Sequence, residues 1–146
     1  MNRQANYQIN SDCKQTCVEA QQMVKIKRVY DPPSNDDGKR ILIDRLWPRG
    51  LKKEEAHFDE WVKDIAPSAK LRTWFNHDPE KWAEFKRLFF KELHGKRETV
   101  DGIVRLAKKG TVTLLFGSKE ERFNNAAALK EYLEARMSAS ERKKAA

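Results

Sequence analysis

The segment 44–50 carries residue types that suit anion binding. It reads Asp-Arg-Leu-Trp-Pro-Arg-Gly, so one carboxylate, two guanidinium groups and an indole lie within seven residues. Arg45 and Arg49 could hold a phosphate or a carboxylate as bidentate donors, and Trp47 could stack on a planar ring. Asp44 is a candidate general base. Alternatively, Asp44 and Arg45 pair with other loops and Trp47 caps the core, which would make the segment architectural.

A second run of candidate groups lies at residues 117–125, which read Gly-Ser-Lys-Glu-Glu-Arg-Phe-Asn-Asn. Lys119 is a candidate anion ligand, and Glu120 is a candidate general base. Asn124 and Asn125 are natural N-caps for a following helix, whose free backbone N–H groups could attract an anion. The run lacks the full glycine-rich pattern of a P-loop, so it does not predict hydrolysis of nucleoside triphosphates.

No pattern in the sequence predicts a metal or a cofactor. His57, His77 and His94 lack the spacing of a metal site or of a catalytic triad. Both cysteines, Cys13 and Cys17, lie near the N-terminus with no histidine nearby to complete a metal set. We therefore expect a site that uses only side chains and backbone groups of the chain, without thiol chemistry.

The charge of the chain favours phosphate-bearing partners. Lys and Arg number 30 against 22 Asp and Glu, which gives a net charge of +8. The charges are interleaved, however, as where Glu92 precedes Lys96 by one helical turn. This pattern favours a mildly basic solvated surface over a dedicated nucleic-acid face, so nucleic acid is a possible partner but not the favoured one.

The 146 residues suffice for one domain. Residues 1–22 are polar and predict a flexible extension, residues 23–137 predict a single domain, and residues 138–146 predict a charged tail. No stretch approaches the roughly 20 apolar residues needed to cross a bilayer. Residues 1–22 also lack the apolar core of a secretory signal, so we expect a cytoplasmic protein with no membrane contact.

Three runs predict strands, at residues 24–30, 40–47 and 111–117. The second is continuous and β-branched, which is typical of a strand buried on both faces in a parallel sheet. The loop 31–38 is shorter than a crossover helix needs, so a hairpin competes with a tight parallel crossover, which we favour. Tyr30, where the first strand ends, is a further candidate to stack on a ring.

The remaining segments show helical patterns, and the order of elements predicts the fold. An α/β fold follows, a small three-layer sandwich with a short, mostly parallel sheet flanked by helices. Ligands collect at the carboxyl ends of strands in such sheets, so we expect the candidate segments to meet there around a small phosphorylated or nucleotide-like ligand. The predicted helices span residues 58–65, 68–75, 78–95, 98–108 and 124–137.

Three runs of the sequence carry a family resemblance: VKIKRVYDPPSNDDGKRILIDRLWPRGLKKEEA, WVKDIAPSAKLRTWFNHDPEKWAEFKRLF and GTVTLLFGSKEERFNNAAALKEYLE. Together they resemble the YeaO-like branch of domain of unknown function 488 over roughly residues 23–135. The resemblance implies a small bacterial α/β protein without an established activity. Phe123 stands where a histidine is usual, which argues against a mechanism that needs an imidazole there. The site residues implied by the resemblance are Tyr30, Asp31, Asp44, Arg45, Trp47, Pro48, Arg49, Gly50, Lys119, Asn124 and Asn125.

Two functions remain open at this point. The first is an enzyme or ligand-binding domain that acts on a small phosphorylated or nucleotide-like molecule. The second is a non-catalytic basic module that binds nucleic acid or a protein partner. The oligomeric state is open as well.

Overall fold

Four parallel strands form the central sheet. A computed structural model describes residues 23–145, and the predictions for residues 1–22 and for the cysteines lie outside the described residues. The strands are β1 (Val24–Arg28), β2 (Lys39–Leu42), β3 (Glu60–Trp61) and β4 (Val112–Phe116), in the spatial order β1-β4-β2-β3. Neighbouring strands all pair in parallel. The predicted α/β class with a parallel sheet is therefore confirmed.

The register shows how the first two strands are related. Strand β4 lies between them, with Leu114 opposite Ile26 of β1 and opposite Ile41 of β2. Strands β1 and β2 therefore run in the same direction without pairing, which excludes the hairpin alternative. Ile41 and Leu114 are fully buried. Continuous apolar, β-branched runs suit such strands because both faces of the sheet are covered.

The segment 58–65 does not form the helix that its apolar spacing predicts. Strand β3 lies within it as a short edge strand beside β2, followed by a single 3-10 turn at Lys63–Ile65. Its apolar side chains enter two different layers, because Trp61 packs with Leu42 whereas Ile65 joins the main core. Packing at the edge of the sheet overrides the helical spacing.

Four helices lie in the described part of the chain: α2 (Ala69–Phe75), α3 (Trp82–His94), α4 (Arg97–Lys109) and α5 (Asn125–Ala145). Ser68 caps α2 by accepting a hydrogen bond from the backbone N–H of Leu71 at 3.2 Å. Asp78 caps the 3-10 turn Pro79–Lys81, which leads into α3. Helix α5 continues through residues 138–145, which the sequence predicts as a tail. Within residues 23–145, no helix is long and apolar enough to cross a membrane.

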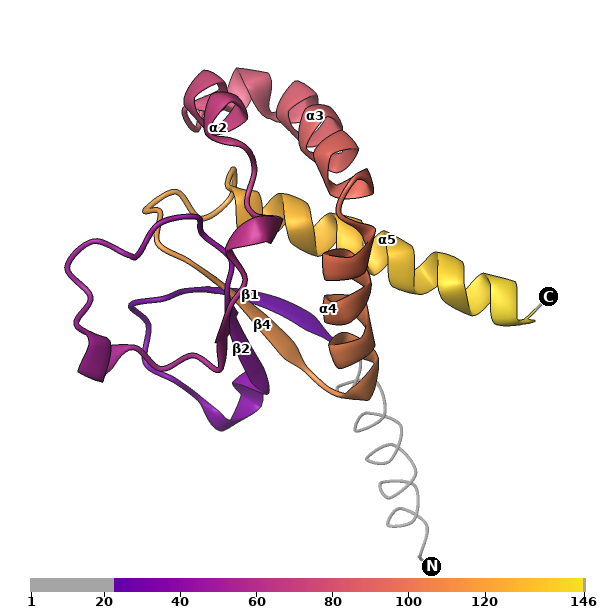
Figure 1. Cartoon of the computed structure of the whole chain (residues 1–146), viewed down its shortest axis with the longest axis horizontal. Helices are drawn as coiled ribbons and strands as arrows, with labels where there is room; N and C mark the ends of the chain where they lie inside the picture. The colour runs from indigo at the N-terminus through magenta and orange to yellow at the C-terminus, as the bar shows by residue number, and fades with distance from the viewer. Residues whose placement is uncertain (1–22, 146) are drawn as a thin grey trace, which may run out of the picture.

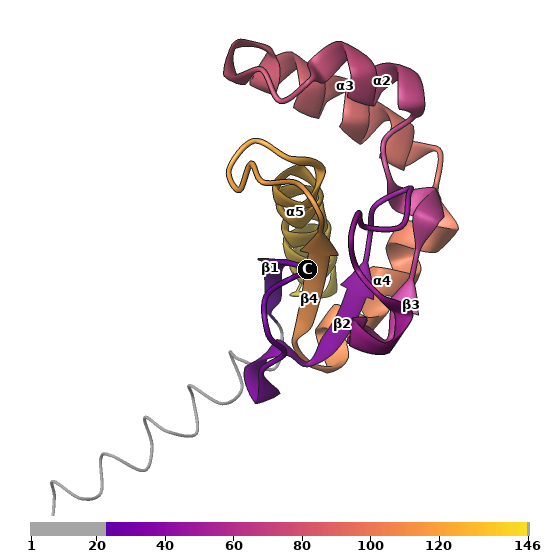
Figure 2. The ribbon, with the colours of Figure 1, turned by 90° about the vertical axis from the view of Figure 1, so that its left-hand side faces the viewer.

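The sheet separates a helical layer from a loop layer (Figure 1). Side chains alternate between its faces, so Ile41 and Leu114 pack with α3, α4 and α5 while Leu42 and Leu115 pack against Phe58 on the opposite face. Each such buried side chain contributes about 1.5–3 kcal/mol to folding. Helices α2 and α3 lie across the end toward which the strands point, as Figure 2 shows. They are therefore placed to cover the carboxyl edge of the sheet.

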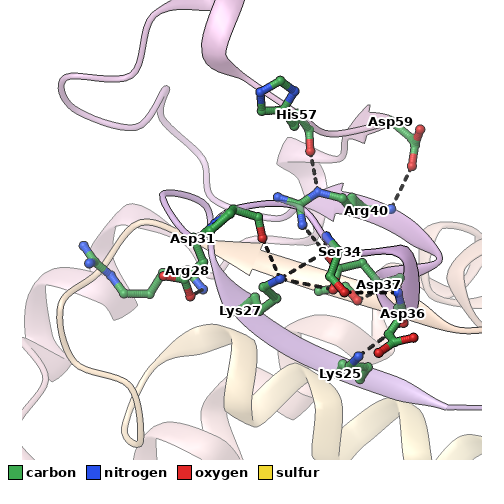
Figure 3. Close-up of polar contacts among 12 residues, drawn as sticks. Lys25, Lys27, Arg28, Asp31, Ser34, Asp36, Asp37, Arg40, His57 and Asp59 are labelled. Carbon is green, nitrogen blue, oxygen red and sulfur yellow. Dashed lines mark hydrogen bonds and ion pairs between the residues drawn. The ribbon is translucent and has the colours of Figure 1, made fainter.

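A buried ionic network ties the loop after β1 to the face opposite the helices (Figure 3). Asp37, which is 1% exposed, accepts hydrogen bonds from Lys27 Nζ at 3.1 Å, from Ser34 N at 2.9 Å and from Arg40 Nη1. The Arg40 guanidinium also donates to the carbonyl of His57. Burial raises the pKa of Asp37, but the bonds from Ser34, Lys27 and Arg40 outweigh it and hold that pKa below its ordinary value. The network fixes the loop that leaves β1.

Candidate functional site

A cavity of about 270 Å³ lies where β1, β2 and β4 end, below α2 and the loop that follows it. Pockets for drug-sized ligands usually measure about 300–1,000 Å³, so this one suits a small ligand. Residues from the ends of three strands meet in its wall, as expected for a parallel sheet. The polar and aromatic lining residues are Tyr30, Asp44, Arg45, Trp47, Arg49, Arg72, His77, Ser118 and Asn125.

Asp44 joins the ends of two neighbouring strands. Its Oδ2 accepts a hydrogen bond from the backbone N–H of Gly117 at 2.8 Å, and its Oδ1 accepts one from Asn125 Nδ2 at 3.3 Å. A side chain at residue 117 would crowd the carboxylate, because a Cβ there would lie 3.2 Å from Oδ2. Burial raises the pKa of Asp44, although the two hydrogen bonds and the charges of Arg72 and His77 oppose the rise. Both carboxylate oxygens are thus engaged within the protein.

Three arginines surround the cavity. Arg45 Nη2 donates a hydrogen bond to the carbonyl of Pro67 at 3.3 Å, which fixes the guanidinium at the rim. The side chains of Arg49 and Arg72 are exposed, and they make no hydrogen bond or ion pair with the side chains described, those of residues 23–139. Their donors are therefore free for a ligand. Three guanidinium groups face one carboxylate, so the cavity carries an excess of positive charge.

His77 reaches the cavity through an unusual backbone conformation. Asn76 and His77 have φ values of 46° and 54°, in the left-handed region that side chains rarely adopt. Nδ1 of His77 lies 3.1 Å from the carbonyl of Phe123. Because a carbonyl only accepts, Nδ1 carries the proton, and Nε2 is left to accept from a ligand or, when protonated, to donate to it. Strained backbone at a cavity wall is common where a side chain has a functional role.

The aromatic groups of the site are held in place. The hydroxyl of Tyr30 donates to the carbonyl of Arg49 at 2.6 Å. Trp47 donates from Nε1 to the carbonyl of Leu51 at 2.7 Å, and its ring meets that of Trp61 edge-on with centroids 5.5 Å apart. Trp47 is nevertheless 38% exposed. One part of the indole packs on the loop layer, and another part is accessible at the cavity.

Five of the predicted residues lie outside the cavity lining, among them Asp31 and Gly50, which the family resemblance implies. Lys119 is exposed beside it. Glu120 Oε2 accepts from the backbone N–H of Arg122 at 3.0 Å and of Phe123 at 3.3 Å, and these bonds lower the pKa of Glu120. Asn124 is fully buried, and its Oδ1 accepts from the backbone N–H three residues later, in the first turn of α5. The structure gives Glu120 and Asn124 roles in shaping the loop before α5.

Sequence reasoning did not find Arg72 and His77 as site residues. Both come from α2 and the turn after it, and only the tertiary fold brings them over the ends of the strands. The sequence gives only a weak signal for the left-handed turn at Asn76 and His77. An asparagine followed by an Asp-Pro cap is typical of the end of a helix, but it does not place His77 at a cavity. Among the side chains that the structure describes, those of residues 23–139, no group of three or more His, Cys, Asp or Glu is arranged as a metal site requires.

The fold and the cavity define a parallel α/β protein with a basic cavity at the carboxyl edge of its sheet. The chain belongs to the family described as the inactive DUF488-N3 subclade, whose model matches residues 23–146. The predicted resemblance to the YeaO-like branch of domain of unknown function 488 is thereby confirmed.

Two bacterial relatives illustrate the relationship. The uncharacterised protein YeaO of Escherichia coli (strain K12) is 41% identical over 110 residues, which cover 75% of this chain and 96% of the relative. The uncharacterised protein Rv3073c of Mycobacterium tuberculosis (strain H37Rv) is 35% identical over 113 residues, covering 77% of this chain and 95% of the relative. No solved structure matches the chain.

Proposed function

We propose that this protein binds a small phosphorylated or nucleotide-like ligand in the cavity at the carboxyl edge of the sheet. The observation that carries the proposal is the charge of the wall. Arg45, Arg49 and Arg72 surround a cavity whose carboxylate, Asp44, already accepts two hydrogen bonds from the protein. An anionic group would restore the charge balance and occupy the free guanidinium donors.

Binding without a chemical step fits the site better than catalysis does. Both oxygens of Asp44 are engaged, and the carboxylate of Glu120 caps backbone N–H groups of its own loop. No carboxylate of the predicted pair is therefore free to serve as a base. The family description also calls this subclade inactive. A cytoplasmic location, where small phosphorylated molecules are abundant, is part of the proposal.

The proposal can be tested by titrating the protein with AMP and following heat release or tryptophan fluorescence. The variant Arg49→Ala/Arg72→Ala removes two guanidinium groups that have no described partner, so its melting temperature should match that of the wild type. A lost hydrogen bond to a charged group is worth about 1.5–3 kcal/mol, so the Kd for AMP should rise at least about tenfold.

The matched control is Arg105→Ala/Lys109→Ala, which removes two exposed cations from α4, away from the cavity. It has the same net charge as the test variant and should bind AMP like the wild type. Absence of AMP binding to the wild type, or equal loss in both variants, would contradict the proposal. If the wild type binds DNA or RNA at about 50 mM salt and both variants lose this binding equally, the result would instead favour a basic module that binds phosphates over its whole surface.

A further inference from the structure

A second cavity adjoins the first and shares Arg45 with it. It measures about 660 Å³ and lies between the loop after β2, the end of α3 and the start of α4. Arg45 lines both cavities, so its guanidinium stands at the boundary between them. Lys96 and Arg97 provide two more cations in the wall of the second cavity.

Two consecutive carbonyls bring cations of the two cavities together. Lys96 Nζ donates to the carbonyl of Ala66 at 3.0 Å, and Arg45 Nη2 donates to the carbonyl of Pro67 at 3.3 Å. Carbonyls are neutral, so these bonds position the cations without cancelling their charge. Burial lowers the pKa of Lys96, and the nearby charge of Arg45 lowers it further. The two cations repel each other across the boundary.

Acids near the second cavity oppose this repulsion, because the charges of Glu92 and Asp64 both favour the charged form of Lys96. Both oxygens of Glu92 accept hydrogen bonds, from Ser68 N at 2.9 Å and from Ser68 Oγ at 2.7 Å, which fix the carboxylate without changing its charge. Asp64 and Glu98 also line the cavity. The lining of the second cavity thus holds three cations, including the shared Arg45, and two carboxylates.

We propose that the two cavities form one bipartite site for a small nucleotide-like ligand that carries at least two phosphate groups. One phosphate lies in the first cavity between Arg45, Arg49 and Arg72. The other lies in the second cavity between Arg45, Lys96 and Arg97. This inference rests on the proposed function, since it assigns a second phosphate to a ligand that the first cavity already holds.

The test compares three ligands that differ only in their phosphates: AMP, ATP and adenosine 3′,5′-bisphosphate. ATP adds its phosphates in line with the phosphate of AMP, whereas the bisphosphate adds one at another position of the ribose. At least one of the larger ligands should bind wild type about tenfold tighter than AMP, a gain equivalent to about 1.4 kcal/mol. The variants Arg97→Glu and Lys96→Ala/Arg97→Ala should lose that gain and bind AMP as the wild type does. If the double variant does not fold, Arg97→Glu still tests the second phosphate site, because Arg97 is exposed.

Each outcome separates this inference from the proposed function. If AMP binds but neither ATP nor adenosine 3′,5′-bisphosphate binds more tightly than AMP, the bipartite site does not exist and the proposed function stands. If the gain persists in Arg97→Glu, the second phosphate does not bind in the second cavity and the inference is wrong. If the gain is equally lost in Arg105→Ala/Lys109→Ala, general charge attraction explains it and the inference is also wrong. If AMP does not bind at all, the proposed function fails and the bipartite site fails with it.

Discussion

Replacing Asp37 by alanine should strongly destabilise the fold. The carboxylate is 1% exposed and accepts hydrogen bonds from Lys27 and Ser34 as well as from Arg40. The substitution leaves the Arg40 side chain, which is 8% exposed, buried without its carboxylate partner. The carbonyl of His57 remains as an acceptor for Arg40, but it carries no charge.

The burial of the pair between Asp37 and Arg40 determines how much free energy of unfolding the substitution should remove. Removing one partner of a buried ion pair costs about 3–5 kcal/mol, because a charge is then left buried without compensation. Domains are usually stable by only about 5–15 kcal/mol, so Asp37→Ala should remove a large part of the free energy of unfolding. Asp37→Asn should cost less, since the amide oxygen can still accept from the backbone N–H of Ser34.

Urea unfolding at neutral pH, followed by circular dichroism, measures both variants against the wild type. Glu84→Ala is the control, because it breaks the pair between Glu84 and Arg87 on the exposed surface of α3. It should leave the unfolding midpoint unchanged, as exposed pairs contribute little. A loss below about 1 kcal/mol for Asp37→Ala would refute the reasoning, since that is the value of a solvated surface pair.

Three further predictions follow from individual residues. Gly38→Ala should lower the urea midpoint, because Gly38 has a φ of 63° and an added Cβ would overlap the carbonyl of Thr111. Asp44→Asn should bind AMP more tightly in calorimetry at neutral pH, because it removes a partly buried negative charge that repels the anion. The pKa of Asp37 lies below its ordinary 3.8, so its stabilising contribution is complete above that pH and disappears as the pH falls through the folded-state pKa. The difference in unfolding free energy between the wild type and Asp37→Asn should therefore shrink on acidification. The raised pKa of Asp44 gives a contribution to stability that is present below pH 3.8 and lost as the pH rises, but both proteins contain Asp44, so this contribution cancels in the difference.

The main strands could be predicted because their signals are local. β2 and β4 are continuous apolar runs bounded by turn residues, and such runs are buried wherever the sheet is covered on both faces. Strand β3 could not be predicted, because it is two residues long and exists through its pairing with β2. Phe58, Trp61 and Ile65 have helical spacing, yet they pack into two separate layers of the fold.

The candidate site was predictable where its residues follow strands. Asp44, Arg45 and Arg49 leave β2 in a parallel sheet, so their place at the carboxyl edge follows from topology alone. Arg72 and His77 enter the same cavity from α2 and its αL turn, and no local pattern specifies that helix as a cover for the sheet. The strand order, which places β4 between β1 and β2, was equally inaccessible because it depends on long-range pairing.

The central claim is that the cavity at the carboxyl edge of the sheet holds a phosphate-bearing ligand. Its most direct test is a titration of nitrogen-labelled protein with AMP, followed through backbone and indole N–H resonances in two-dimensional NMR. We predict saturable shift changes that are largest for the amides of Gly117 and His77 and for the indole N–H of Trp47. Absence of saturable changes, or changes confined to the exposed lysines and arginines of α3 and α4, would contradict the claim.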